Sequence, residues 1–116
     1  MLRLRNTLCL AIGVILLFAL SATAQNTAPM PFGNWATKPA SEQLSVTPNG
    51  CKFSGNNGKS SVLIEGKCTW DNPTTVGAIL TIMNIHNYEP APIRFSVVWV
   101  NPKTIKVNGD TFYKQD

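Results

Sequence analysis

Short runs of β-branched and aromatic residues, separated by turn residues at close intervals, follow one another from Gly33 to the end of the chain. No window in this region shows the apolar period of an amphipathic helix over a useful length. Strands of about five residues joined by tight turns are typical of all-β domains. The sequence therefore predicts an all-β fold, a small antiparallel meander of about eight short strands.

Two hairpins predicted in the first half bring both mature cysteines to the buried face. Their connections lie at residues 47–50 and 65–67, where glycine and asparagine provide turn positions. In each hairpin apolar residues face apolar residues: Leu44 faces Phe53, Val46 faces Cys51, Ile64 faces Cys68 and Val62 faces Trp70. The register and the hydrophobic pattern therefore agree.

Three more hairpins are predicted in the second half, with connections at residues 87–92, 101–103 and 108–109. Asn108-Gly109 is the strongest short hairpin signal in the chain. The first connection sets Leu80 opposite Trp99, Ile82 opposite Val97 and Asn84 opposite Phe95. The other two set Ile105 opposite Trp99, Val107 opposite Val97, Val107 opposite Asp110 and Ile105 opposite Phe112.

Short antiparallel strands of this kind form either a closed or nearly closed barrel or a two-sheet sandwich, and hairpin registers alone do not distinguish these architectures. Closure removes exposed sheet edges, and a small barrel is filled by its own side chains. Either way one core is expected, formed by Leu44, Phe53, Val62, Ile64, Trp70, Leu80, Ile82, Phe95, Val97, Trp99, Ile105 and Phe112.

The N-terminal 24 residues have the pattern of a secretory signal peptide. Arg3 and Arg5 precede an uncharged apolar run at residues 8–20, and Ala22-Thr23-Ala24 follows it. As a helix this run is about 20 Å long, shorter than the ~30 Å hydrocarbon core of a bilayer. We expect cleavage before Gln25 and no lasting membrane insertion.

The mature chain, residues 25–116, is one domain in length. Residues 25–32 contain two prolines and no periodic pattern, so they are predicted to be a flexible tether before a single β domain at 33–116. The mature chain has eight basic and six acidic residues, a net charge of +2, and the basic residues are scattered. Nucleic-acid binding normally needs a clustered basic patch, so no nucleic-acid partner is expected.

Cys51 and Cys68 are predicted to form a structural disulfide in an oxidising compartment. No asparagine of the mature chain lies in an Asn-x-Ser/Thr acceptor without proline, which favours a bacterial source. No lipid-attachment cysteine follows the predicted cleavage site. The expected location is therefore secreted, in the bacterial periplasm.

Few groups in the sequence suggest catalysis. His86 is the single histidine, and both mature cysteines are assigned to the disulfide, so no metal site is expected. No nucleophile motif accompanies His86, and the six carboxylates are dispersed along the chain. The sequence predicts no catalytic residue, no cofactor and no enzyme activity.

The second face of the predicted hairpin at 78–100 is unusually apolar for a half-exposed sheet. One interpretation is that the tether and Trp35 cover this face, so that the strands are buried on both sides. The other is an exposed patch that binds a protein partner. The candidate partner-binding residues are Met83, Ile85, Arg94, Val98 and Val100.

These features together predict a non-catalytic protein-binding module, such as an inhibitor or immunity-type protein that acts on an envelope enzyme. One alternative is a structural or accessory subunit of an envelope assembly, in which the tether pairs with a neighbour. A second alternative is a small hydrolase that uses the dispersed carboxylates. The sequence leaves the partner and the oligomeric state open.

Overall fold

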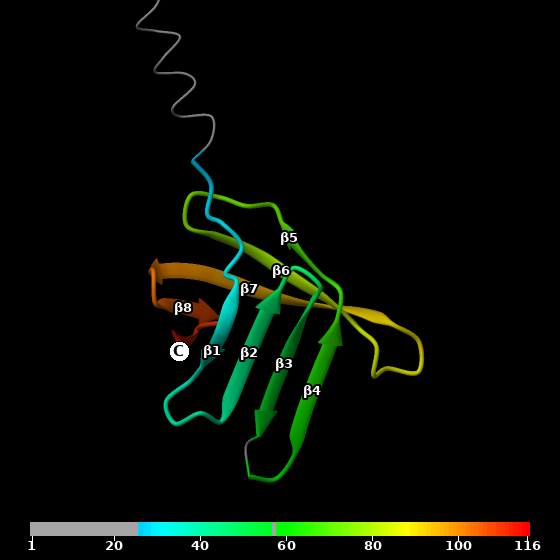
Figure 1. Cartoon of the computed structure of the whole chain (residues 1–116). Helices are drawn as coiled ribbons and strands as arrows, with labels where there is room; N and C mark the ends of the chain where they lie inside the picture. The colour runs from blue at the N-terminus through cyan, green and yellow to red at the C-terminus, as the bar shows by residue number, and fades with distance from the viewer. Residues whose placement is uncertain (1–25, 57) are drawn as a thin grey trace, which may run out of the picture.

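The computed structural model describes residues 26–56 and 58–116, and the predicted signal peptide at 1–24 lies outside them. The described residues form nine antiparallel strands in one nearly closed, barrel-shaped sheet (Figure 1). They contain no helix, and so none long and apolar enough to cross a membrane. The predicted all-β fold is confirmed.

The strands form two meanders that are joined by the pairing of the first strand with the ninth. The first meander is β1 to β4 and the second is β5 to β9, and β1 pairs with β9. β4 and β5 therefore lie at opposite ends of the strand order although they follow one another in sequence. The bounds are β1 Gly33–Ala36, β2 Glu42–Thr47, β3 Gly50–Asn56, β4 Ser61–Gly66, β5 Cys68–Asp71, β6 Gly77–Asn84, β7 Ala91–Asn101, β8 Thr104–Val107 and β9 Asp110–Lys114.

Three of the predicted hairpins have the predicted register. In β2–β3, Leu44 faces Phe53 and Val46 faces Cys51. In the last two hairpins the confirmed pairs are Val97 with Val107, Trp99 with Ile105, Ile105 with Phe112 and Val107 with Asp110. The ninth strand is β1, which belongs to none of the predicted hairpins.

The predicted hairpin between β4 and β5 is wrong, because the chain does not reverse at residues 65–67. Phe53 of β3 pairs with Ile64, whereas Cys68 and Trp70 of β5 pair with Ile82 and Leu80 of β6. Gly66 continues in an extended conformation past β6, so close that a Cβ atom would lie 1.8 Å from the Met83 carbonyl oxygen. β4 and β5 thus form one bent strand shared by both meanders.

The predicted register between β6 and β7 is shifted by four residues. Leu80 faces Phe95 rather than Trp99, Ile82 faces Ile93 rather than Val97, and Asn84 faces Ala91 rather than Phe95. The connection has the expected six residues but lies at 85–90 instead of 87–92, because β6 ends at Asn84 and β7 begins at Ala91. Since the shift is even, every side chain keeps its predicted face of the sheet.

Pro92 lies inside β7 although proline cannot donate a backbone hydrogen bond. Its partner in the register is Met83. The Met83 N–H points to the other side of β6, where it donates to the Lys67 carbonyl oxygen at 2.8 Å. The missing N–H of Pro92 therefore leaves no acceptor of β6 without a donor. This explains why the proline does not end the strand where the sequence pattern suggested.

The core lies inside the barrel and contains most of the predicted residues. Trp35 of β1 and Val46 and Val107 join it, whereas Val62 is 48% exposed because it lies near the free end of β4. The fully or largely buried predicted members are Leu44, Leu80, Ile82, Phe95, Val97, Ile105 and Phe112, with Phe53, Ile64, Trp70 and Trp99 packed against them. The predicted disulfide between Cys51 and Cys68 is present and joins β3 to β5.

The segment expected to be a flexible tether lies against the barrel from Ala28 onward. All three tryptophans of the chain donate their indole N–H to its carbonyl oxygens: Trp70 to Ala28 at 2.9 Å, Trp99 to Pro29 at 2.7 Å and Trp35 to Pro31 at 3.0 Å. A buried indole N–H needs such an acceptor. The segment at 28–31 supplies these acceptors and so forms part of the domain.

Candidate protein-binding surface

The five predicted partner-binding residues all lie on the outer face of β6, β7 or the connection after β6. Met83, Val98, Val100 and Ile85 are exposed hydrophobic side chains, and Arg94 is exposed as well. Trp35 lies in the core, and the segment at 28–31 lies against the tryptophan side chains, so neither covers this face. The interpretation that both faces of this hairpin are buried is therefore wrong.

These residues do not form one continuous patch. Met83 faces Pro92 near the connection, whereas Val98 faces Gly77 at the opposite end of β6. Pro92 and Val98 are six residues apart on β7, about 20 Å at ~3.3 Å per residue. We therefore distinguish a tip surface, formed by Met83, Ile85, Tyr88 and Pro92, from a far surface, formed by Val76, Val98 and Val100.

A polar stripe separates the two surfaces. Thr81 and Arg94 face one another on β6 and β7, between the two apolar ends. Asp71 Oδ2 accepts hydrogen bonds from Thr81 Oγ1 at 2.7 Å and from Thr69 Oγ1 at 2.9 Å. These two hydrogen bonds, with a smaller contribution from the charge of Arg94, hold the pKa of Asp71 below its ordinary value. The middle of this face therefore remains charged.

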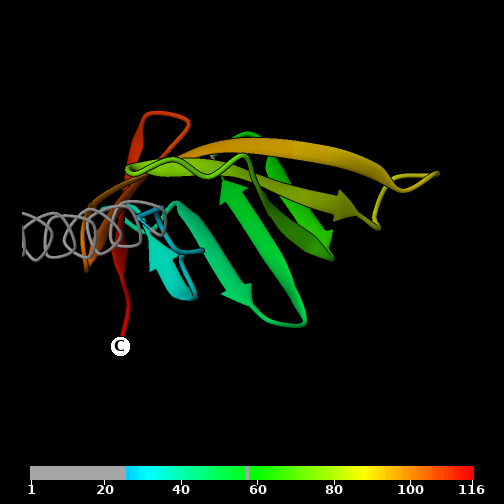
Figure 2. The ribbon, with the colours of Figure 1, turned by 90° about the horizontal axis from the view of Figure 1, so that it is seen from above.

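The tip surface is carried by a hairpin that extends past the body of the barrel (Figures 1 and 2). Asn84 is buried at the base of its connection, and its Oδ1 accepts from the backbone N–H groups of Glu65 and His86, both at 3.2 Å. Its Nδ2 donates to Asn87 Oδ1 at 3.1 Å. The base of the connection is thus fastened to β4, while Tyr88 beyond it is fully exposed.

His86 lies in the connection between β6 and β7, and its contact is with a carboxylate. Its Nε2 atom is 3.1 Å from Glu65 Oε1, and both side chains are partly exposed. This pair holds the connection to β4 from the solvent side. Within the described ranges, no group of three or more His, Cys, Asp or Glu side chains is placed to hold a metal ion.

Two carboxylates that are far apart in sequence come near each other at the other end of the barrel. Partial burial, and then the nearby charge of Asp110, raise the pKa of Glu42. Lys38 and Tyr113 line the same shallow depression, with the Lys38 Nζ atom 4.4 Å from the centroid of the Tyr113 ring. The sequence does not predict this proximity, because it depends on the pairing of β1 with β9.

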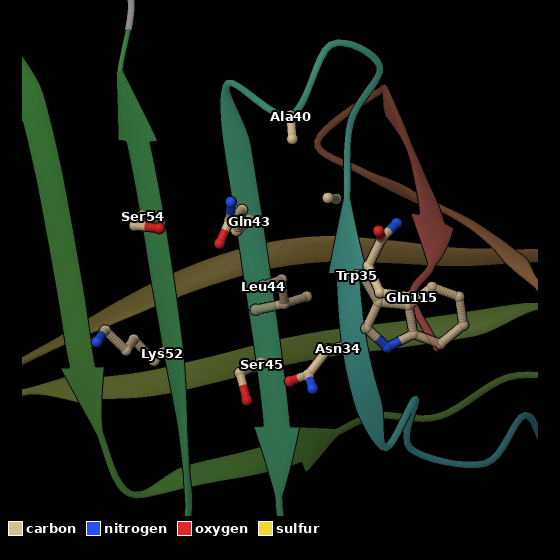
Figure 3. Close-up of a pocket in the computed structure, with 10 residues that line it drawn as sticks. Asn34, Trp35, Ala40, Gln43, Leu44, Ser45, Lys52, Ser54 and Gln115 are labelled. Carbon is tan, nitrogen blue, oxygen red and sulfur yellow. The ribbon is translucent and has the colours of Figure 1, made fainter.

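An open depression of about 410 Å³ lies on β1, β2 and β3. Figure 3 shows its polar side chains: Asn34, Gln43, Ser45, Lys52 and Ser54 lie on these strands, Gln115 follows β9, and all except Lys52 are amides or hydroxyls. None of its ten lining residues carries a carboxylate, an imidazole or a thiol. The depression can donate and accept hydrogen bonds, and Lys52 is its one cationic lining residue.

The free end of β4 is a further candidate surface, outside the residues predicted from the sequence. β4 lies at one end of the strand order, and Val62 and Leu63 are exposed there. The signal is the run Val62-Leu63-Ile64, because three consecutive apolar residues in a strand cannot all face one core. At least one of them must face outward.

Comparisons with known proteins give no relative on which to base a function. No family model matches the chain, and neither the curated proteins nor the solved structures contain a match.

Proposed function

We propose that this protein is an exported, non-catalytic module that binds another protein through the tip surface. The observation that carries the proposal is the exposure of Met83 and Ile85 on a projecting hairpin whose base is fixed by Asn84. Apolar side chains presented on a rigid element are typical of protein-binding surfaces. A disulfide within a domain of this size fits an oxidising compartment, which supports export.

The composition of the connection supports the same proposal. Pro90 and Pro92 restrict the backbone on one side of the connection, and Asn84 fixes its base on the other. A loop that is already ordered loses less conformational entropy when it binds. The fully exposed ring of Tyr88 provides a large contact area of the kind enriched at interfaces.

The packing of residues 28–31 argues against the alternative in which this segment pairs with a neighbouring subunit. Its carbonyl oxygens accept from three tryptophans of the same chain, and Pro31 is fully buried. Insertion into a neighbour would break these contacts. We therefore place the binding surface on the β6–β7 hairpin.

The proposal is tested by capturing proteins from an envelope extract with the mature domain and with two matched variants. Ile85 and Val76 are 59% and 57% exposed at opposite ends of β6. We expect Ile85→Asp to reduce recovery of the captured partner at least tenfold and Val76→Asp to leave it unchanged, with similar melting temperatures for all three proteins. Equal recovery with Ile85→Asp would contradict the proposal, and loss with Val76→Asp alone would move the site to the far surface.

A further inference from the structure

In the described part of the chain, the edge of β4 away from β3 is hydrogen-bonded at its C-terminal end and open at residues 61–63. At its C-terminal end, the Ile85 N–H donates to the Glu65 carbonyl and the Met83 N–H donates to the Lys67 carbonyl, both at 2.8 Å. The Glu65 N–H donates to Asn84 Oδ1. β6 therefore covers this end of the edge as a neighbouring antiparallel strand would.

The backbone groups at residues 61 and 63 point toward the same edge as those of Glu65. In an antiparallel ladder, alternate residues direct both backbone groups to the same neighbour. Since Glu65 bonds to β6, the residues that bond to β3 are Gly66, Ile64 and Val62, and Leu63 and Ser61 face the edge. β6 ends at Asn84 and its chain turns away, so within the described ranges no backbone hydrogen bond reaches this part of the edge.

The side chains beside this edge suit an extended peptide. Leu63 is 41% exposed on the outer face, and Val62 is exposed on the inner face. Val62 lines a hollow of about 300 Å³ together with Phe53 and Gly55. Residues 61–63 contain no proline or charge, which are the usual means of protecting an edge.

We propose that the edge of β4 at residues 61–63 accepts an extended segment of the protein partner as an additional antiparallel strand. The N–H and C=O groups of Ser61 and Leu63 provide four backbone hydrogen-bonding groups for this segment. Its alternate side chains would contact Leu63 on one face and Val62 and Phe53 on the other. Main-chain pairing supplies affinity and the flanking side chains supply specificity in this mode of recognition.

The inference rests on the proposed function, because it names the form in which the protein partner binds. A second copy of this chain is the less favoured occupant. Each copy already uses Glu65 to pair with its own Ile85, so two β4 edges would share only the groups of Ser61 and Leu63. A foreign segment can also reach the adjoining tip surface at Ile85 and Tyr88.

The test replaces one edge N–H without disturbing the ladder to β3. Ser61→Pro removes an N–H that faces the open edge, and Ser61→Ala is the matched control that keeps it. The probe is a library of random twelve-residue peptides displayed on phage and selected on the mature domain. We expect selected peptides with alternating apolar residues that bind the wild type and Ser61→Ala equally and Ser61→Pro at least tenfold more weakly. Equal binding to Ser61→Pro, or no selected peptide, would overturn the inference.

Amide hydrogen exchange gives a second readout on the unmodified domain, which also covers the case in which Ser61→Pro fails to fold. The Leu63 amide is expected to exchange rapidly in the free domain and at least tenfold more slowly with a selected peptide bound. An unchanged exchange rate would contradict strand addition. A dimer in sedimentation that Ser61→Ala retains and Ser61→Pro loses would instead make a second copy the occupant.

The outcomes for the two proposals can be told apart with the envelope extract. A partner that is captured equally by wild type and Ser61→Pro but lost with Ile85→Asp would leave the proposed function in place and overturn strand addition. A partner that is captured equally by all three proteins would overturn both.

Discussion

Removing the disulfide by the double substitution Cys51→Ala and Cys68→Ala is expected to destabilise the domain without changing its fold. The two cysteines are 17 residues apart in sequence. Closing a loop of this length restricts the unfolded chain by roughly 3 kcal/mol at 25 °C on the chain-entropy model. For a domain below about 100 residues, this corresponds to a fall in melting temperature of about 12–24 °C.

The position of the disulfide adds a local prediction. β3 and β5 are not neighbours in the sheet, so the bond joins the two meanders beside the bend at Gly66. Without it, the amides of β5 are expected to exchange faster, whereas those of β8 keep their protection. Urea unfolding gives the free energy, and an unchanged m-value would show that the unfolding transition exposes the same surface. A loss of less than about 1 kcal/mol would refute the loop-closure reasoning.

Three further predictions concern the contacts that hold the segment before β1, the connection after β6 and the polar stripe. Trp35→Phe removes the indole donor to the buried Pro31 carbonyl and should cost about 1–3 kcal/mol of unfolding free energy in urea titrations. The hydrogen bond from the Trp99 indole to Pro29 is exposed, so a loss with Trp35→Phe as small as that with Trp99→Phe would contradict this prediction. Asn84→Ala leaves the Glu65 N–H without its acceptor and should cost about 1–3 kcal/mol, whereas Asn87→Ala, which removes only an acceptor of Asn84 Nδ2, should cost less. Thr81→Val should raise the pKa of Asp71 toward its ordinary value in an NMR titration. Because the folded-state pKa of Asp71 is lowered, its stabilising contribution is present above the ordinary pKa and is lost as pH falls through the lowered one, so Thr81→Val should also weaken the acid-side loss of stability.

The parts of the fold that follow from local turn chemistry were predictable from the sequence. Asn108-Gly109 specifies a tight hairpin, and the pairing of Val107 with Asp110 follows from it. The connection at 47–50 likewise sets Val46 opposite Cys51. Within such hairpins the turn residues and the hydrophobic alternation each specify the same register.

The parts that depend on contacts between distant strands were not predictable in this way. Gly66 reads as a turn residue, but its lack of a side chain serves a close approach to the backbone at Met83. The pairing of β1 with β9, which closes the ring of strands and brings Asp110 near Glu42, has no local signal.

The candidate surface was predictable in its residues but not in its arrangement. Alternation alone places Met83 and Val98 on the outer face of the sheet, and the structure agrees. Whether they form one patch depends on the register, and the observed pairing of Met83 with Pro92 and of Val98 with Gly77 places them at opposite ends. The free edge of β4 depends on where β6 turns away, which Asn84 determines through its buried side chain.

The neighbouring positions of β1 and β9 have a consequence for how the chain is made. During synthesis β1 is the first of the nine described strands to emerge, but its partner on one side, β9, is the ninth. The ring cannot close until Lys114 is available to lie beside Trp35. Until then, the edge of β1 that pairs with β9 lacks its strand partner, so β1 and β2 can pair early whereas the barrel is completed late.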